Sequence, residues 1–351
     1  MSFAYNVLPA RVVFGAGALD QIGREISLLG AQRALVLSTP GQQALAAEVA
    51  RRLGAHCAGI LPKAVMHVPL ESARAARLEA TRLGADCAVA IGGGSTIGLA
   101  KAIALESALP ILAIPTTYSG SEMTPIYGIT EAGLKRTGRD PKVLPRCVIY
   151  DPVLTLGLPV AVSVTSGINA IAHAAEALYA PDANPLVSLI AEEGMRALAG
   201  GLPAVKRNPG DIEARGSCLY GAWLCGTALG AVGMSLHHKL CHTLGGTFNL
   251  PHAETHTVVL PHALAYNRAA AGEAMDRIAA ALGGSDAALA AFDLAQKLGA
   301  PVSLKQLGMP EGGVERAADL ATQTPYPNPR PLERAAIRRL LQDAYAGRRP
   351  R

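Results

Sequence analysis

Residues 87–114 read CAVAIGGGSTIGLAKAIALESALPILAI, and this stretch decides the fold. The apolar run Cys87–Ile91 predicts a buried strand, the glycines lead into a helical pattern over Ser95–Leu105, and Ile111–Ile114 predicts a second strand. A strand, a helix and a strand at this spacing are typical of a parallel βαβ unit with a right-handed crossover. Because both strands are apolar throughout rather than at alternate positions, we expect a sheet that is covered on both faces.

The same alternation of short apolar runs and helical patterns extends to both sides of this stretch, so several such units are expected in one sheet. The runs before it resemble strands buried on both faces, whereas those after it flank a polar loop. The predicted strands are Ala34–Ser38 and His56–Leu61, the predicted helices are Gln42–Leu53 and Leu70–Leu83, and Ile126–Thr130 and Cys147–Tyr150 are expected as mixed or edge strands.

The pattern changes after Asp151-Pro152. From Val164 onward, Ala- and Leu-rich segments compatible with helices dominate, and no convincing strand follows. At about 100–200 residues per domain, the chain is long enough for two domains. The prediction is an α/β dinucleotide-binding domain with a mostly parallel sheet over residues 1–155 and an all-helical domain over residues 156–351. We expect the ligand to bind between them, where sites are common.

Composition excludes several classes of protein. Half of the residues are apolar, 17% are charged and the mean hydropathy is +0.25, which rules out a largely disordered chain. The net charge of +5 is spread out, so no nucleic-acid partner is expected. No apolar run of about 18 residues is free of charges and glycines, and no signal-peptide pattern opens the chain, so no membrane partner is expected. Six scattered cysteines without a C-x-x-C pair predict reduced thiols in a cytoplasmic protein.

Two loops after predicted strands have the composition of ligand-binding loops. Gly92-Gly93-Gly94-Ser95 opens a helix, where glycines allow close approach and free N–H groups favour a phosphate. The alternative is a plain turn in which Ser95 caps the helix. We therefore predict a site for the pyrophosphate of some dinucleotide. The loop matches neither the G-x-G-x-x-G nor the P-loop pattern, so it does not specify which nucleotide binds. Pro115–Ser121, which carries several hydroxyls, suits a ligand in the crevice of an open sheet or an ordinary polar turn.

Seven of the nine histidines lie between residues 173 and 262. His238 and His242, like His252 and His256, are four residues apart, which places both rings on one face of a helix. Asn169 and His173 have the same spacing. A lone histidine is usually structural, and we expect that of His256 and His262 taken singly, whereas facing pairs in a helical domain are typical of a metal or proton-transfer site.

Together these motifs resemble the iron-containing alcohol dehydrogenase superfamily, whose architecture is shared with dehydroquinate synthase. The resemblance covers nearly the whole chain, and it implies a dinucleotide-binding α/β half and a helical, metal-binding half. The matching segments, in the family's order, are Phe14–Gly17, Gly92–Ser95, Pro115–Thr117, Tyr150–Pro152, Gly167–Glu176, His238–Gly245 and Pro251-His252.

Three departures from the family pattern point to one branch of it. Asn169 stands where the family has the aspartate ligand of iron or zinc, and a neutral amide is a poor ligand for such metals. Gly98 stands where an aspartate is usual, and the loop over Tyr118–Glu122 is one residue shorter. These departures look like the branch that reduces the conjugated C=C bond of maleylacetate to 3-oxoadipate with NADH or NADPH, without a required metal, in the breakdown of aromatic compounds.

The resemblance also implies roles for individual residues. The histidine places of the family's metal site correspond to His173, His238 and His252, and protonatable imidazoles would take over the role of the metal. Thr39 stands where many relatives have an aspartate on the adenosine ribose, so acceptance of both NADH and NADPH is expected. The expected catalytic residues are His238, His242, His252 and His173, with His238 or His242 as proton donor or enolate partner. The expected cofactor contacts are Gly93, Gly94 and Ser95 at the pyrophosphate, Thr116, Thr117, Ser119 and Thr124 at the nicotinamide half, Lys135 near the ribose, and Thr39. The weaker candidates for binding the substrate are Asn169, Tyr118 and Arg139.

Three other functions stay open at this point. A metal-dependent alcohol dehydrogenase could retain three histidine ligands and a water. A dehydroquinate-synthase-like lyase would need a metal and more Lys and Arg for a phosphorylated substrate. A non-catalytic nucleotide-binding module would leave the histidines without a purpose. The expected partner is a small dicarboxylate keto acid, the expected cofactor is NADH or NADPH, and a homodimer is expected.

Overall fold

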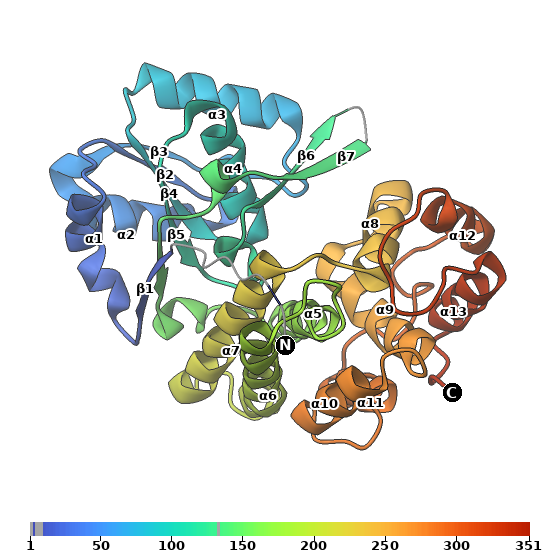
Figure 1. Cartoon of the computed structure of the whole chain (residues 1–351). Coiled ribbons are helices and arrows are strands. Elements are labelled where there is room, and N and C mark those ends of the chain that lie inside the picture. Colours follow the sequence, from blue (N-terminus) through green and yellow to red (C-terminus); the bar gives the residue numbers. More distant parts are fainter. Residues whose placement is uncertain (1–2, 4–9, 132–133) are drawn as a thin grey trace. The chain divides into compact units, whose positions relative to one another are not determined.

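The computed structural model describes residues 3, 10–131 and 134–351, and the chain divides into two compact units. One spans Val7–Leu158 and the other contains Pro159–Arg351. Figure 1 shows that the first unit is α/β and that the second is helical. This agrees with the predicted fold class.

The α/β unit is built on a six-stranded sheet in the order β1-β8-β5-β4-β2-β3, with every neighbouring pair parallel. Helices α2, α3 and α4 follow their strands as predicted, whereas β1 and α1 were not among the predicted elements. The strands are β1 Arg11–Phe14, β2 Ala34–Leu37, β3 Cys57–Leu61, β4 Cys87–Gly92, β5 Ile111–Pro115 and β8 Cys147–Tyr150, and the helices are α1 Ile22–Leu28, α2 Gln43–Leu53, α3 Leu70–Arg82 and α4 Gly94–Ser107.

Helices cover both faces of this sheet, which explains why its strands are apolar at every position. Val36 and Val89 pack in one core with α1 and α2, whereas Leu35 and Ala88 pack in a second core with α3 and α4. Successive residues of a strand point to opposite faces, so each strand supplies both cores. Full burial of a side chain of this size stabilises the fold by about 1.5–3 kcal/mol.

Three strands differ from the expectations. Cys147–Tyr150 was expected as a mixed or edge strand, but it forms β8, which is fully buried and parallel between β1 and β5. The edge of the sheet next to β8 is formed by β1. The four residues of β1 are too few and too exposed for a strand to be predicted from their pattern. Ile126–Glu131 (β6) does not join the sheet, because it pairs antiparallel with β7, Leu134–Arg139.

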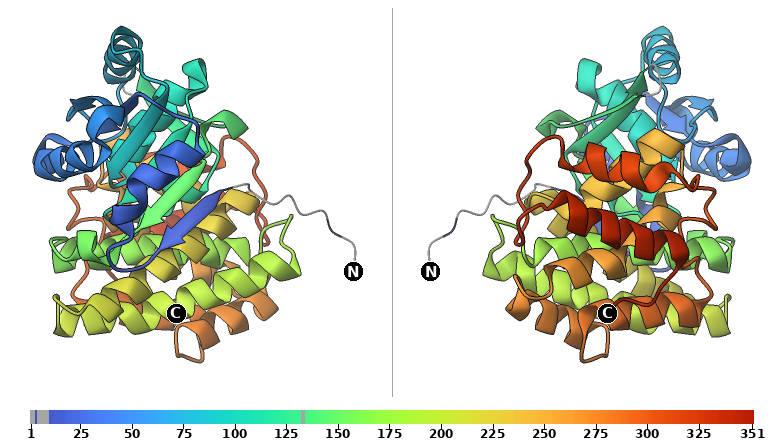
Figure 2. Two further views of the ribbon diagram at one scale, coloured as in Figure 1. Left: turned by 90° about the vertical axis from the view of Figure 1, so that its left-hand side faces the viewer. Right: turned by 90° about the vertical axis from the view of Figure 1, so that its right-hand side faces the viewer.

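The helical unit packs its helices through small residues and an aliphatic core. A Cβ atom at Gly194 would lie 2.8 Å from the Sγ atom of Cys225, so glycine allows α6 and α7 to approach closely. A second core joins α8, α9, α12 and α13, and Figure 2 shows α12 and α13 side by side. The helices are α5 Val160–Ala177, α6 Pro185–Arg207, α7 Ile212–Ala231, α8 Leu236–Phe248, α9 His252–Asn267, α10 Gly272–Ala281, α11 Ala287–Leu298, α12 Gly313–Thr322 and α13 Arg334–Ala346.

Within the described residues, no single helix has both the length and the apolar composition to span a membrane. Only α7 and α8 taken together reach that threshold, and they are bent by 97° relative to each other. All six cysteines are free thiols.

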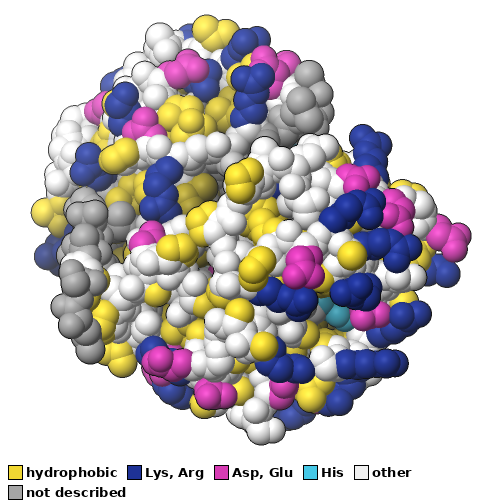
Figure 3. All heavy atoms as spheres, turned by 45° about the vertical axis from the view of Figure 1, so that its right-hand side comes forward, with side chains coloured by type: hydrophobic (Ala, Val, Ile, Leu, Met, Phe, Trp, Pro, Cys, Tyr) yellow, Lys and Arg dark blue, Asp and Glu magenta, His cyan; other side chains and the backbone are white. Residues whose placement is uncertain are grey.

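Charged side chains of both signs are interspersed on the face shown in Figure 3. Many of them are paired. Arg334 of α13 contacts Glu315 and Asp319 of α12 at 3.0 and 2.6 Å, and Arg338 pairs with the same Glu315. Exposed pairs of this kind contribute little to stability, but they leave the positive charge dispersed rather than gathered in one patch on this face.

Candidate active site

The glycine loop after β4 is held in a shape that only glycine permits at two positions. Gly92 has a φ of +151°, and a Cβ atom there would lie 2.5 Å from Thr96 Oγ1 and 2.7 Å from Gln42 Oε1. A Cβ atom at Gly93 would lie 2.9 Å from Thr117 Cγ2. The backbone at these two glycines is therefore in close contact with neighbouring side chains. Because glycine has no Cβ atom, such a loop also lets a ligand approach its backbone N–H groups closely.

The same loop ends at the N-terminus of α4. Its N-cap residue, Gly93, has no side chain that could cap the helix, and Gly94 is exposed. The first N–H groups of a helix have no partner within it and carry partial positive charge. Gly93, Gly94 and the half-buried Ser95 thus form an anion-binding end, and these residues fit the pyrophosphate of a dinucleotide.

The loop lies where the chain's direction across the sheet reverses. From β2 the chain moves to β3 on one side, whereas β4 pairs with β2 on the other side. Ligands of open sheets bind outside the strand ends at such a reversal. Thr39 follows β2 here, and Gln42, which the sequence analysis missed, accepts from Thr39 Oγ1 at 3.4 Å and donates to Thr116 Oγ1 at 2.7 Å.

The loop after β5 continues this edge. Thr117 packs against Gly93, and Ser119 is half-buried and donates to Glu122 Oε2 at 3.4 Å. The hydroxyl of Thr124 is buried and accepts a hydrogen bond from Lys101 at 3.0 Å. Thr124 therefore supports the shape of the loop from within.

Lys101 and Glu122 are two fully buried titratable groups that the sequence analysis did not single out. The ammonium group of Lys101 donates to the backbone oxygens of Ser121, Thr124 and Ile126 at 2.7–2.8 Å. Burial lowers the pKa of Lys101 to about 7 and raises the pKa of Glu122, which accepts a hydrogen bond from Tyr150. A lysine in the middle of the otherwise apolar run Ile97–Leu105 is the signal that could have revealed it.

The weaker candidates of this unit have different surroundings. Tyr118 is fully buried, whereas Arg139 is exposed at the end of β7. Lys135 belongs to the same strand, and its side chain lies outside the described residues. Gly98 has a packing role, because a Cβ atom there would lie 2.8 Å from Cγ2 of Val68. An aspartate at position 98 would require that side chain to move.

In the helical unit, α5, α8 and α9 bring six histidines together, which we call the histidine cluster: His173, His237, His238, His242, His252 and His256. The ring centres of His173 and His238 are 5.1 Å apart, and those of His242 and His252 are 6.4 Å apart. All four expected catalytic histidines are thus in the cluster, together with His256, whose ring is 4.4 Å from that of His252. His237, on which the sequence analysis reached no conclusion, is 4.8 Å from His256.

Burial determines the charge of the inner rings. The pKa values of His173, His237 and His256 lie well below that of an ordinary histidine, first because burial disfavours the charged ring and then because neighbouring histidines would repel it. These three rings are therefore neutral at pH 7. Among the described residues, three buried atoms that face no hydrogen-bond partner are Asn169 Oδ1, His173 Nδ1 and His238 Nε2.

One carboxylate, Glu176 on α5, reaches the cluster. Its Oε2 atom lies 2.6 Å from Nδ1 of His238 and accepts from the backbone N–H of Ser235 at 3.0 Å. Its Oε1 atom accepts from the backbone N–H of His237 at 2.8 Å. Sequence reasoning placed Glu176 only inside a family motif, because its partners are about 60 residues away along the chain.

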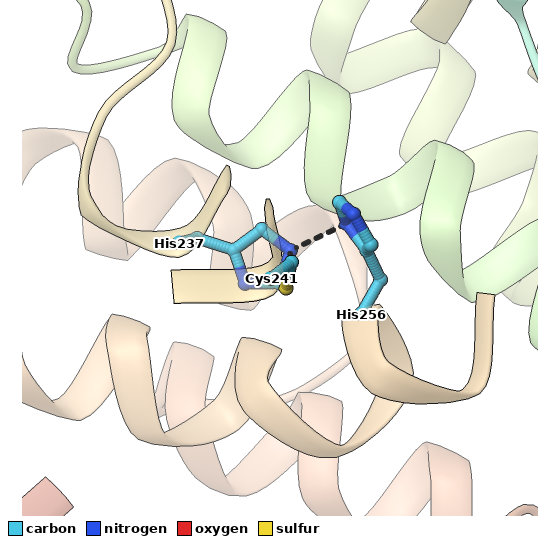
Figure 4. Close-up of side chains that lie close together, drawn as sticks. All are labelled: His237, Cys241 and His256. Atoms are coloured by element: carbon cyan, nitrogen blue, oxygen red, sulfur yellow. Dashed lines mark hydrogen bonds between the residues drawn. The ribbon is translucent and has the colours of Figure 1, made fainter. Parts of the chain in front are cut away.

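At the family's metal place, Asn169 offers a neutral amide oxygen where the family has a carboxylate, and an amide is a weaker ligand for a divalent transition metal. Both oxygens of Glu176 already accept N–H groups. A tighter group, His237, Cys241 and His256, has donor atoms within 4.8 Å of one another (Figure 4). There, however, the two histidines are hydrogen-bonded to each other at 2.9 Å, and burial raises the pKa of the Cys241 thiol well above its ordinary value.

Comparison with known proteins gives one consistent result. A model described as "Iron-containing alcohol dehydrogenase" matches residues 9–152, and one described as "Fe-containing alcohol dehydrogenase family, C-terminal" matches residues 163–345. The chain is similar to maleylacetate reductase from Burkholderia cepacia, with 66% identity over 349 residues and 99% of each chain covered. It is 57% identical over 350 residues to maleylacetate reductase from Sphingobium indicum, covering 100% of this chain and 99% of that one. The crystal structure of maleylacetate reductase from Agrobacterium tumefaciens is 55% identical, with a TM-score of 0.96 and 100% of both chains covered.

Proposed function

We infer the reaction from one premise: the chain belongs to the iron-containing alcohol dehydrogenase family. It is an oxidoreductase that reduces the conjugated C=C bond of maleylacetate to 3-oxoadipate, with a nicotinamide dinucleotide as the reductant. The observation that carries this conclusion is the full-length similarity to maleylacetate reductases. The departures at Asn169 and Gly98 distinguish the chain from the metal-binding pattern of the wider family.

The substrate is a 4-oxo-2-enedioate, and its chemistry decides what the protein must supply. When bound, the dinucleotide would supply a hydride for the carbon β to the ketone. The electron pair of the C=C bond would then form a new C=C bond to the ketone carbon, and the pair of the C=O bond would become the charge on the enolate oxygen. Adding a proton to the carbon next to the ketone completes the reduction. The protein must therefore orient the substrate, stabilise the enolate and deliver one proton.

We propose that the histidine cluster performs these tasks. Nε2 of His238 is buried and has no hydrogen-bond partner among the described residues, so it is available to a substrate oxygen or carbon. His173, His237 and His256 are held neutral by burial and are unsuited to deliver a proton at neutral pH. Of the two expected proton donors, His238 is favoured because its buried Nε2 is available to the substrate. His242 and His252 add polar groups near the same place.

We propose that the α/β unit binds the dinucleotide at the ends of β2, β4 and β5. Gly93, Gly94 and Ser95 would contact the pyrophosphate, and Thr116, Thr117 and Ser119 would lie along the nicotinamide half. The half-buried Thr39 at the end of β2 places no carboxylate beside the adenosine ribose, which supports use of both NADH and NADPH. Lys135 stays a predicted ribose contact.

We further propose that the reaction needs no metal ion. The support is the donor set at the family's metal place, where an amide replaces a carboxylate and the nearby Glu176 is engaged by His238 and by backbone N–H groups. A homodimer and a cytoplasmic location are also proposed, the latter because the free cysteines and a nicotinamide cofactor suit a reducing compartment.

The experiment is a spectrophotometric assay of NADH and NADPH oxidation with maleylacetate, before and after prolonged dialysis against a chelator. We expect turnover with both nucleotides, unchanged by the chelator. Absence of turnover with maleylacetate would refute the proposed substrate. Loss of activity on chelation, restored by zinc or iron, would refute only the metal-independent mechanism.

A further inference from the structure

Glu176 is buried completely and receives an unusual number of donors. Its two oxygens accept the backbone N–H groups of Ser235 and His237 and contact Nδ1 of His238. The hydroxyl of Tyr179 approaches Oε1 at 3.5 Å. A buried carboxylate is stable only where its lone pairs are satisfied in this way, so the site is built around the charge.

The position of Glu176 relative to α8 is equally specific. Ser235 is the N-cap of α8, but its own side chain makes no capping hydrogen bond. Glu176, from α5, accepts the N–H groups that a capping side chain would normally accept, including that of His238 at 3.3 Å. The carboxylate therefore fixes both the start of the helix that carries His238 and the ring of His238 itself.

We propose that Glu176 is the positioning residue of the reaction, holding the proton of neutral His238 on Nδ1 so that Nε2 is presented to the substrate. A carboxylate oxygen 2.6 Å from Nδ1 can only accept a hydrogen bond, so the hydrogen of the neutral ring lies on Nδ1, which selects the tautomer. To deliver a proton to the carbon next to the ketone, Nε2 must first take one from a water molecule, which leaves hydroxide, and the same carboxylate then offsets the positive charge of the ring. This role rests on the proposed function, but the tautomer itself does not.

The first test uses no substrate. The ¹⁵N NMR spectrum of the protein with ring-labelled histidine reports which nitrogen carries the proton, and the His238 signals are assigned by their loss in His238→Ala. We expect the proton of His238 on Nδ1. A proton on Nε2 of the neutral ring would overturn the proposal, whatever the substrate of the enzyme is.

The second test is a double-mutant cycle between Glu176→Gln and His238→Ala, measured as kcat with maleylacetate. Glu176→Gln should lower kcat roughly 10²-fold, as removal of a residue that orients a catalytic group does, with the KM for NADH within about twofold of that of the wild type. In the His238→Ala background it should change kcat less than about twofold. An equal loss in both backgrounds would show a general structural role and overturn the proposal.

Tyr179→Phe is the matched control, because it removes a distant donor to Oε1 and leaves the contact of Oε2 with His238 in place. It should keep both the tautomer and kcat. If Glu176→Gln does not fold, Glu176→Asp takes its place in the cycle, since the shorter carboxylate cannot reach both His238 and the start of α8. A wild type that is inactive on maleylacetate but has the expected tautomer refutes the proposed substrate and leaves the positioning role intact.

Discussion

His237 and His256 are joined by a hydrogen bond of 2.9 Å between Nε2 and Nδ1, and both rings are fully buried. One ring must donate and the other accept, so the hydrogen bond is lost if both rings are protonated, and burial disfavours even one charged ring. The bond connects α8 to α9. It also makes the cluster sensitive to acid.

We therefore expect the free energy of unfolding to fall as the pH drops below about 6.5. Unfolded histidines bind protons near that pH, whereas the folded pKa values of His237 and His256 are far lower. Each of these two histidines therefore lowers the free energy of unfolding by about 1.4 kcal/mol for every pH unit below 6.5. His262, outside the cluster, has a folded pKa of about 4 because of burial. The free energy of unfolding, measured by urea titration at several pH values between 4 and 7.5, should depend less steeply on pH in His262→Gln. The difference in slope should correspond to about one proton. An unchanged slope would contradict the burial argument.

The catalytic prediction separates His238 and His242 from the buried His262. His238→Ala should lower kcat by about 10²–10⁴-fold, the usual contribution of a general acid, with the KM for the nucleotide preserved. His242→Ala should have a smaller effect, because His242 is exposed and His238 is the ring that Glu176 orients. His262→Ala should change stability but not kcat. Near-normal kcat in both the His238 and His242 variants would show that neither residue is the proton donor.

Asn169→Asp tests the proposal that the amide at this position weakens metal binding. Restoring a carboxylate beside His173 and His238 should raise the affinity for zinc by about tenfold or more, since a charged oxygen replaces a neutral one. Equilibrium dialysis followed by elemental analysis measures this, with the wild type as reference. Equal zinc affinity of the variant and the wild type would contradict the prediction.

Thr39→Asp tests the position of the adenosine ribose. The wild type should use NADPH within about tenfold of NADH, a difference of ~1.4 kcal/mol. An aspartate at the end of β2 should repel the 2′-phosphate and depress kcat/KM for NADPH much more than for NADH. Equal effects on both nucleotides would mean that Thr39 does not lie beside the ribose.

Lys101→Met tests the buried centre beneath the loop after β5. The variant leaves the backbone oxygens of Ser121, Thr124 and Ile126 without their donor and Glu122 without its buried counter-charge. We expect a loss of about 3–5 kcal/mol in the free energy of unfolding and a higher KM for NADH. Lys63→Met, which changes an exposed lysine of the same unit, is the control and should be near neutral. Equal stability of the two variants would show that Lys101 does not hold the loop.

Local sequence patterns were sufficient for most of the fold. Cys87–Ile91 and the helix after it are predictable because an apolar run, a glycine loop and a helical period depend on neighbouring residues. The place of β8 is not, because pairing with β1 and β5 joins residues more than 30 positions apart.

The candidate site divides in the same way. Spacing alone indicated that His238 and His242 share a helical face, and the family motif indicated the place of Asn169, so the sequence by itself determined which residues are candidates for the chemistry. Only the tertiary structure decided how they are held. Glu176 meets His238 because α5 packs where α8 begins, and Lys101 meets the loop after β5 because α4 lies beneath it. Contacts of this kind depend on the three-dimensional packing of whole helices, and no local pattern of residues records them.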